Sequence, residues 1–238
     1  MRDFKDHTAV VTGASSGIGR ALALALAAEG ARVHLVGRDA ERLAAVASLA
    51  RETSSVTTHR ADLADDAELV ALGDRLSRES ESVDLLVHAA GVYGRGPVAE
   101  APVAGLDTQY RVNLRAPFAL TQALVPRLQA AGGHVVFVNS AVRASAGVGS
   151  YAATKHALRV LADAVREELG PLGVRVLTLF VGRTATPMQR AIHGLEGRPW
   201  DPARLLQPED VAACVLHAVG LPRTAEVTEL TVRPFRRL

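Results

Sequence analysis

The sequence of 238 residues contains one cysteine and only two lysines, Lys5 and Lys155. The single cysteine, Cys214, excludes internal disulfide bonds and is compatible with a reducing compartment. Its apolar neighbours predict a position in the core. The longest apolar run near the start, residues 21–28, is far too short to cross a bilayer. The charged start MRDFKDH leads straight into a predicted strand, so we expect no signal peptide, no membrane partner and a cytoplasmic protein.

A strong net charge is also lacking. The 27 Lys and Arg residues face 25 Asp and Glu residues, which leaves a formal charge of +2. This excess is too small and too evenly spread to indicate nucleic-acid binding. Arg233, Arg236 and Arg237 form a local basic tail that we expect to be solvated. Repeats, low-complexity tracts and linkers are absent from the sequence, so the length predicts a single domain over 1–238.

What the sequence does contain is a regular alternation of short β-like runs and helical segments. Compact, β-branched runs predict strands at 8–12, 32–36, 57–60, 83–88, 134–139, 174–180 and 226–232. Helical length and periodicity predict helices at 19–29, 39–53, 64–78, 106–130 and 151–169. This alternation predicts an α/β fold: one Rossmann-type, doubly wound parallel sheet of about seven strands with helices on both faces.

One stretch, residues 187–207, shows no clear pattern. It follows the sixth predicted strand. A long loop inside a compact domain is often a lid or a binding loop, so we predict a substrate-binding lid here. The alternative is a disordered insertion.

A glycine-rich turn follows the first predicted strand. It reads Thr-Gly-Ala-Ser-Ser-Gly-Ile-Gly over residues 12–19, and a helix begins at once. Glycines let a backbone turn tightly and approach a pyrophosphate, and a helix N-terminus offers N–H groups to an anion. The turn therefore predicts a nucleotide site.

Tyr151 and Lys155 stand four residues apart on a predicted helix, where positions i and i+4 share a face. A nearby ammonium favours phenolate and is expected to lower the tyrosine pKa. Of the 27 Lys and Arg residues in the chain, 25 are arginine. A lysine at position 155 therefore indicates a role that requires a compact ammonium group rather than a guanidinium. The alternative is an ordinary pair on a solvated helix.

Five motifs in order resemble the short-chain dehydrogenase/reductase family in its short form, over essentially the whole chain. They are residues 12–19, Ala89-Ala90-Gly91, Asn113, Ser140 with Tyr151 and Lys155, and Val181-Gly182 with Thr186. The resemblance implies hydride transfer between a nicotinamide cofactor and a secondary alcohol or carbonyl.

The resemblance also implies a role for each catalytic residue. Tyr151 would be the general acid or base, and Lys155 would lower its pKa and bond the nicotinamide ribose. Ser140 would hydrogen-bond the substrate oxygen. Asn113, in an irregular part of the fourth predicted helix, would position a water that links Lys155 to solvent.

The cofactor is expected to be NADP(H), with NAD(H) as a possible substitute. Arg38 follows the second strand, where an arginine suits a 2′-phosphate, and Asp39 is expected to cap the next helix. The expected cofactor-binding residues are Gly13, Ser15, Ser16, Gly17, Ile18, Gly19, Arg38, Asp62, Leu63, Ala89, Ala90, Gly91, Tyr151, Lys155, Gly182, Thr184 and Thr186. We expect no metal site.

The chain departs from the family pattern in three places. His88 and Ala89 stand where the family has two asparagines, and we expect His88 to be a buried structural residue. Val181 replaces the usual proline of the Pro-Gly pair. The segment from Ser140 to Tyr151 is about two residues shorter than usual, and it contains Ser145, an alternative catalytic serine.

Other function classes stay open at this level. The same fold could serve a catalytically silent nucleotide-binding regulator, or an epimerase or dehydratase of the longer relatives. The four catalytic positions favour the oxidoreductase. The family also implies a homodimer or homotetramer that pairs through the fourth and fifth helices. Candidates for the wall of the substrate pocket are Val92, Tyr93, Arg143, Ala144, Val148, Val181, Met188, Ile192 and Trp200.

Overall fold

A computed structural model describes residues 4–235 of the chain. Seven strands form one sheet in the order β3-β2-β1-β4-β5-β6-β7, and all neighbouring strands are parallel. The strands are β1 (Thr8–Thr12), β2 (Arg32–Gly37), β3 (Val56–Arg60), β4 (Leu85–His88), β5 (His134–Ser140), β6 (Arg175–Val181) and β7 (Glu229–Val232).

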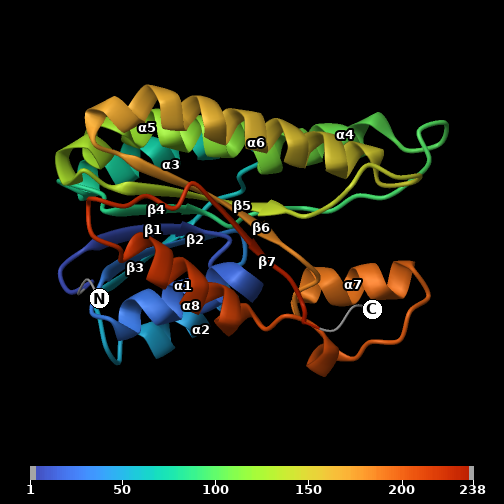
Figure 1. The fold of residues 1–238 in the computed structure, drawn as a ribbon, viewed down its shortest axis with the longest axis horizontal. Helices are drawn as coiled ribbons and strands as arrows, with labels where there is room; N and C mark the ends of the chain where they lie inside the picture. Colours follow the sequence, from blue (N-terminus) through green and yellow to red (C-terminus); the bar gives the residue numbers. More distant parts are fainter. Residues whose placement is uncertain (1–3, 236–238) are drawn as a thin grey trace.

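Helices cover both faces of this sheet (Figure 1). They are α1 (Gly17–Ala28), α2 (Ala40–Ala50), α3 (Asp66–Glu79), α4 (Val103–Tyr110), α5 (Ala116–Ala131), α6 (Gly149–Leu169), α7 (Pro187–Leu195) and α8 (Pro208–Val219). A π-helical turn, η1 (Arg111–Arg115), joins α4 to α5, and two short 3-10 turns are η2 (Gly170–Leu172) and η3 (Pro202–Arg204). Helices α1, α2 and α8 lie on one face, and α3 to α6 lie on the other (Figure 1).

The burial of the strands explains this layering. All residues of β1 and β4 are buried, because helices pack on both of their sides. The two edge strands, β3 and β7, are instead partly exposed. Two separate apolar cores result. One includes Leu22, Leu26 and Val215 under α1 and α8, and the other includes Leu120 and Leu158 under α5 and α6.

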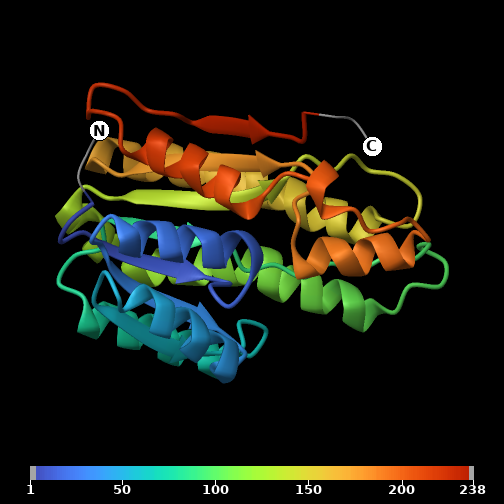
Figure 2. The same cartoon turned by 90° about the horizontal axis from the view of Figure 1, so that it is seen from below.

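The strand order reverses between β1 and β4, since the chain adds β2 and β3 on one side of β1 and then crosses to the other side. Such a reversal opens a crevice at the carboxyl ends of the strands, where ligands bind in this class of fold. Helix α7 lies beyond those strand ends (Figure 2).

The predicted α/β sheet is confirmed, and the strand boundaries differ by a few residues. The expectation of a patternless loop is wrong for the first part of residues 187–207, because α7 begins there. Thr186 caps this helix by accepting a hydrogen bond from the Gln189 N–H at 3.2 Å, and Pro187 occupies its first turn. Helix α8 was not predicted.

Two smaller expectations also have outcomes. Cys214 is partly exposed rather than in the core, because α8 turns Val211 and Val215 toward the sheet instead. Arg233 is exposed, as expected, whereas Arg236 and Arg237 lie outside the described residues. Within residues 4–235, the helices are too short or too polar for any of them to span a membrane.

Candidate active site

The turn between β1 and α1 is so tight that it requires glycine. Gly13 and Gly17 have φ values of +67° and +54°, in the left-handed region. A Cβ on Gly13 would lie 2.7 Å from the backbone nitrogen of Ala90, and one on Gly19 would lie 2.3 Å from the carbonyl oxygen of Gly13. This tight turn places the first turn of α1 at the wall of a cavity. The N–H groups of a helix N-terminus at such a wall suit a pyrophosphate.

Thr12 ties this turn to the neighbouring strand. Its hydroxyl donates to the carbonyl oxygen of Val87 at 3.2 Å and accepts from the N–H groups of Ala89 and Ala90 at 3.1 and 3.2 Å. Thr12 thus braces the end of β4, where the family's asparagine side chain is missing.

His88, at the other departure from the family pattern, is a buried structural residue, as expected. Its Nε2 lies 2.9 Å from the Thr121 hydroxyl, and its ring stacks on Phe137 with centroids 5.0 Å apart. Burial lowers the pKa of His88 to about 3, so the ring is neutral.

The first of two cavities, which we call the cofactor cavity, has a volume of about 370 Å³ and runs along the carboxyl ends of β1, β2 and β4. Fifteen of the seventeen residues predicted to hold a cofactor line it. The other two, Gly182 and Thr184, line the second cavity instead.

Arg38 lies at one end of the cofactor cavity together with Asp39 and Arg42. Asp39 caps α2, as expected, because its carboxylate accepts from the Arg42 N–H at 3.0 Å. The same carboxylate pairs with the Arg42 guanidinium at 3.1 Å. Arg42 was not predicted, although its place in the first turn of the helix that follows Arg38 would have indicated it.

At the other end of the cofactor cavity, α6 carries Tyr151 and Lys155. Lys155 is buried, and its Nζ donates to the carbonyl oxygen of Val138 at 3.0 Å. Burial lowers its pKa to about 8. Burial also raises the pKa of Tyr151, against a hydrogen bond from Ser140 that lowers it. The sequence predicted a Tyr151 pKa lowered by Lys155, and this prediction is wrong because desolvation outweighs the other influences.

Ser140 ends β5 beside Tyr151, and its position is set by the residue before it. The Asn139 Oδ1 accepts from the Ser140 N–H at 2.8 Å, and the Asn139 Nδ2 donates to the Lys155 carbonyl oxygen at 3.0 Å. Asn139 therefore joins the end of β5 to the backbone of α6 at Lys155. It was not predicted, because its role depends on a contact with another element.

Asn113 lies in the π-helical turn, which confirms the irregularity expected in this helix. Its side chain is fully buried: Oδ1 accepts from the Val92 N–H at 2.8 Å, and Nδ2 donates to the Val92 carbonyl oxygen at 2.9 Å and to the Thr154 hydroxyl at 3.1 Å. Asn113 thus fastens the segment after β4 to α6, one residue before Lys155.

The second cavity, which we call the substrate cavity, has a volume of about 360 Å³. It is lined by Ser140 and Tyr151 together with residues of α7 and of the segment before it. The Tyr93 ring contacts the Tyr151 ring at 5.0 Å between centroids. Ser145 also lines this cavity, but Ser140 is the serine that bonds Tyr151.

A charged group forms part of the wall of the substrate cavity. Arg183 pairs with Glu196 at 2.8 Å, and Arg198 approaches the same carboxylate at 3.3 Å. The hydrogen bond from Arg183 is the main cause that lowers the pKa of Glu196. These residues were not predicted, because Arg183 precedes the stretch 187–207 that contains the other two, and only their ion pairs mark them.

The predicted substrate-pocket residues fall into three groups. Tyr93, Val148, Val181, Met188 and Ile192 line the substrate cavity. Val92 lines the cofactor cavity instead. Arg143, Ala144 and Trp200 are not among the lining residues of either cavity, and Trp200 packs edge-on against His193.

Comparison with known proteins gives one consistent result. The family model for short chain dehydrogenases matches residues 7–195. An uncharacterised oxidoreductase of Staphylococcus saprophyticus is 31% identical over 98% of this chain and 100% of its own length. An alcohol dehydrogenase from the archaeon Thermococcus sibiricus, solved with 5-hydroxy-NADP, superposes with a TM-score of 0.87 at 27% identity, over 98% of this chain and 99% of its own.

A metagenomic short-chain oxidoreductase solved with NADP superposes with a TM-score of 0.84 at 30% identity, over 99% of this chain and all of its own. The chain therefore belongs to the short-chain dehydrogenase/reductase family and is an oxidoreductase of that class.

Proposed function

We propose that the protein is an NADP(H)-dependent oxidoreductase that interconverts a secondary alcohol and a carbonyl, with Tyr151 as the general acid or base. One observation carries this proposal. Tyr151 lines both the cofactor cavity and the substrate cavity, and it is hydrogen-bonded to Ser140 at their junction. A reacting carbon placed there would lie beside both a proton donor and a hydride source.

The protonation of Tyr151 suits carbonyl reduction. Its pKa is raised by burial, so the phenol keeps its proton at neutral pH and can donate it to a carbonyl oxygen. Ser140 would donate a second hydrogen bond to the same oxygen and stabilise the negative charge that develops on it. In the opposite direction the phenolate must form first, so alcohol oxidation should accelerate as the pH rises.

Lys155 and Asn113 support this chemistry from the cofactor side. The Lys155 ammonium lies at the wall of the cofactor cavity, where it would bond the ribose of a nicotinamide cofactor. Asn113 holds the neighbouring turn of α6 in place through Thr154. We assign to Asn113 the positioning of a water that connects Lys155 to solvent, as the family resemblance implies.

The residues at the wall of the cofactor cavity fit a dinucleotide. Gly13 and Gly19 let the backbone of the turn pack too closely for a Cβ, and α1 presents its N-terminus at the cavity wall. The nicotinamide of such a cofactor supplies or accepts the hydride. Arg38 and Arg42 favour a 2′-phosphate at the adenosine end. The Asp39 carboxylate already bonds the Arg42 backbone and guanidinium, so it is not free to bind the ribose 2′-hydroxyl of NAD(H).

The exposed apolar side chains support the expected homo-oligomer. Val103, Leu106 and Tyr110 on α4, Phe118 on α5 and Val160 on α6 are between 43% and 71% exposed. A patch of this kind often marks an interface. Size-exclusion chromatography with light scattering should give a dimer or a tetramer, and a monomer at micromolar concentration would contradict this assignment.

A panel of ketones, aldehydes and alcohols, tested with both cofactors, examines the proposed function. We expect NADPH consumption with at least one carbonyl compound, no turnover by Tyr151→Phe, and unchanged NADPH binding by that variant. If NADPH binds tightly and no compound turns over in either direction, the protein is the nucleotide-binding regulator considered above.

A further inference from the structure

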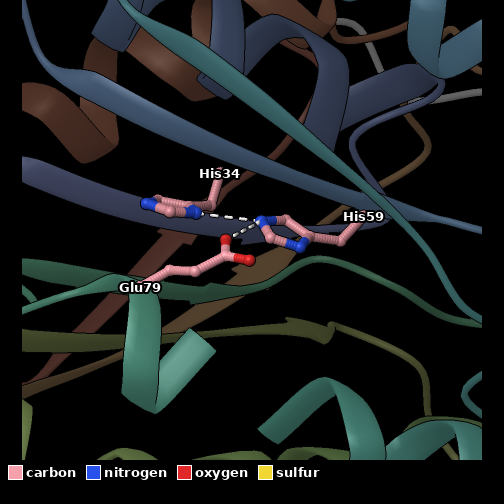
Figure 3. A group of neighbouring side chains, drawn as sticks. All are labelled: His34, His59 and Glu79. Atoms are coloured by element: carbon pink, nitrogen blue, oxygen red, sulfur yellow. Dashed lines mark hydrogen bonds and ion pairs between the residues drawn. The ribbon is translucent and has the colours of Figure 1, made fainter. Parts of the chain in front are cut away.

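Two histidines and a glutamate converge at the edge of the sheet, away from both cavities (Figure 3). His34 lies on β2, His59 on the edge strand β3, and Glu79 at the last residue of α3. The His34 Nδ1 is 2.9 Å from the His59 Nε2, and that nitrogen is 3.8 Å from the Glu79 Oε2. Within residues 4–235 this is the one group of at least three such side chains whose ligand atoms all lie within 4.8 Å of one another.

We propose that His34 Nδ1, His59 Nε2 and the Glu79 carboxylate bind one Zn²⁺ ion, which ties β2, β3 and α3 together. Two imidazoles and a carboxylate are a preferred donor set for Zn²⁺, at bond lengths of about 2.0–2.2 Å. Around a tetrahedral ion with such bonds, neighbouring ligand atoms are roughly 3.3 Å apart. The spacings of 2.9 and 3.8 Å lie on either side of that value, so small side-chain rotations would complete the site.

The three groups differ in burial, so the site is closed at the two histidines and open to solvent at the glutamate. His34 and His59 are 8% and 1% exposed, whereas the Glu79 side chain is 43% exposed. An ion could therefore arrive past the carboxylate, and a water molecule could complete the coordination from the same side.

A simple hydrogen bond between the two imidazoles explains part of this arrangement but not all of it. It accounts for the 2.9 Å contact. It does not account for Glu79, an exposed side chain that turns toward the same nitrogen at a distance too long for a hydrogen bond. A cation at the centre would explain why three lone-pair donors converge there.

The two strands that carry the histidines lead to the cofactor cavity. Gly37 ends β2 three residues after His34, and residues 61–63 begin two residues after His59. Gly37 and residues 61–63 all line the cofactor cavity. An ion at this edge would stiffen the two strands whose ends form the adenosine side of that cavity. The sequence shows no metal motif here, because each ligand comes from a different element, and we therefore expected none.

Titration of untagged, EDTA-treated and dialysed full-length protein with ZnCl₂ tests the proposal. Calorimetry should show one ion per chain, and saturation should raise the Tm by on the order of 5 °C. Glu79→Gln changes an exposed helix end, so it should fold normally and weaken Zn²⁺ binding at least about tenfold. His59→Gln should abolish the one-to-one binding. His217→Gln, on the exposed side of α8, is the matched control and should bind like wild type.

Co²⁺ provides a second measurement that does not depend on the stability of the histidine variants. The wild-type complex should show visible d–d absorption bands, and these should change in Glu79→Gln. The proposal is overturned if Zn²⁺ neither binds stoichiometrically nor shifts the Tm. It is equally overturned if Glu79→Gln and His59→Gln bind Zn²⁺ as tightly as His217→Gln does.

Discussion

The two cavities that meet at Tyr151 differ in the kinds of residues that form their walls. The wall of the cofactor cavity consists largely of backbone and small residues at strand ends, such as Gly13, Gly17 and Ala90. The wall of the substrate cavity includes more large or charged side chains, such as Tyr93, Ile192 and Arg183, from segments far apart in the chain. A site made of backbone leaves glycines at fixed spacings in the sequence. A site made of side chains exists only after distant segments have come together.

The substitution with the largest expected effect tests whether the two cavities share one reacting group. Tyr151→Phe removes the proton donor and leaves the aromatic ring, so turnover should fall on the order of 10²–10⁴-fold. Binding of NADPH, followed by fluorescence, should stay near the wild-type value. Near-normal turnover would mean that the proton comes from another group and that the junction at Tyr151 is not the reaction centre.

A smaller loss of turnover is expected on the substrate side alone. Ser140→Ala removes one hydrogen bond to the reacting oxygen and should cost about 10²–10³-fold in kcat. Ser145→Ala is the control, because it lines the same cavity and should stay close to wild type. If the two variants exchange these results, Ser145 is the catalytic serine.

On the cofactor side, burial of the Lys155 ammonium should lower the free energy of unfolding. Its pKa is about 8 in the folded protein and about 10.4 in an unfolded chain, so the unfolded state binds more protons between these values. The free energy of unfolding should therefore rise with pH from about 8 to 10. Lys155→Met removes the buried charge and should raise the free energy of unfolding at pH 7 by up to about 3 kcal/mol.

Urea denaturation of wild type and Lys155→Met at pH 7 and pH 10 measures this effect. The variant should lose turnover while it gains stability. Lys155→Arg separates charge from shape, because it keeps a cation that cannot be neutralised, and it should fold and lose most turnover. Wild-type kcat in Lys155→Arg would show that the ammonium has no special task.

The adenosine end of the cofactor cavity should distinguish the two cofactors. Arg38→Ala should raise the KM for NADPH by on the order of tenfold and leave the KM for NADH nearly unchanged. Arg42→Ala should have a smaller effect, because its guanidinium is partly engaged by Asp39. Equal effects on both cofactors would make Arg38 an ordinary surface arginine.

The smallest effect concerns the proposed lid over the substrate cavity. His193 is the one buried residue of α7, so this helix should open more easily than the core helices. Amide hydrogen exchange in residues 187–207 should slow when NADPH and a substrate analogue are both bound, whereas the glycine turn should respond to NADPH alone. Slow exchange in residues 187–207 of the free protein would contradict a lid.

The sequence predicted most of the cofactor cavity and the apolar part of the substrate cavity, but it missed the charged pair in the substrate cavity, for physical reasons. Gly13 and Gly17 adopt φ values that few other residues tolerate, so their role is visible without the fold. Arg183 and Glu196 have no such local signature, and only their ion pair marks them. The Tyr151 pKa was predicted in the wrong direction, because an i, i+4 spacing gives the neighbouring charge but not the depth of burial.

The sequence by itself determined the alternation of strands and helices, the glycine turn after β1, and the pairing of Tyr151 with Lys155 on one helix. These features depend on backbone sterics and on residues close together in the chain. The tertiary structure alone decided how Asn139 and Asn113 lock α6, that Arg183 pairs with Glu196 in the wall of the substrate cavity, and that His34 and His59 meet Glu79. Each of these depends on contacts between distant elements, whose distances and burial exist only once the sheet has closed and its helices have packed.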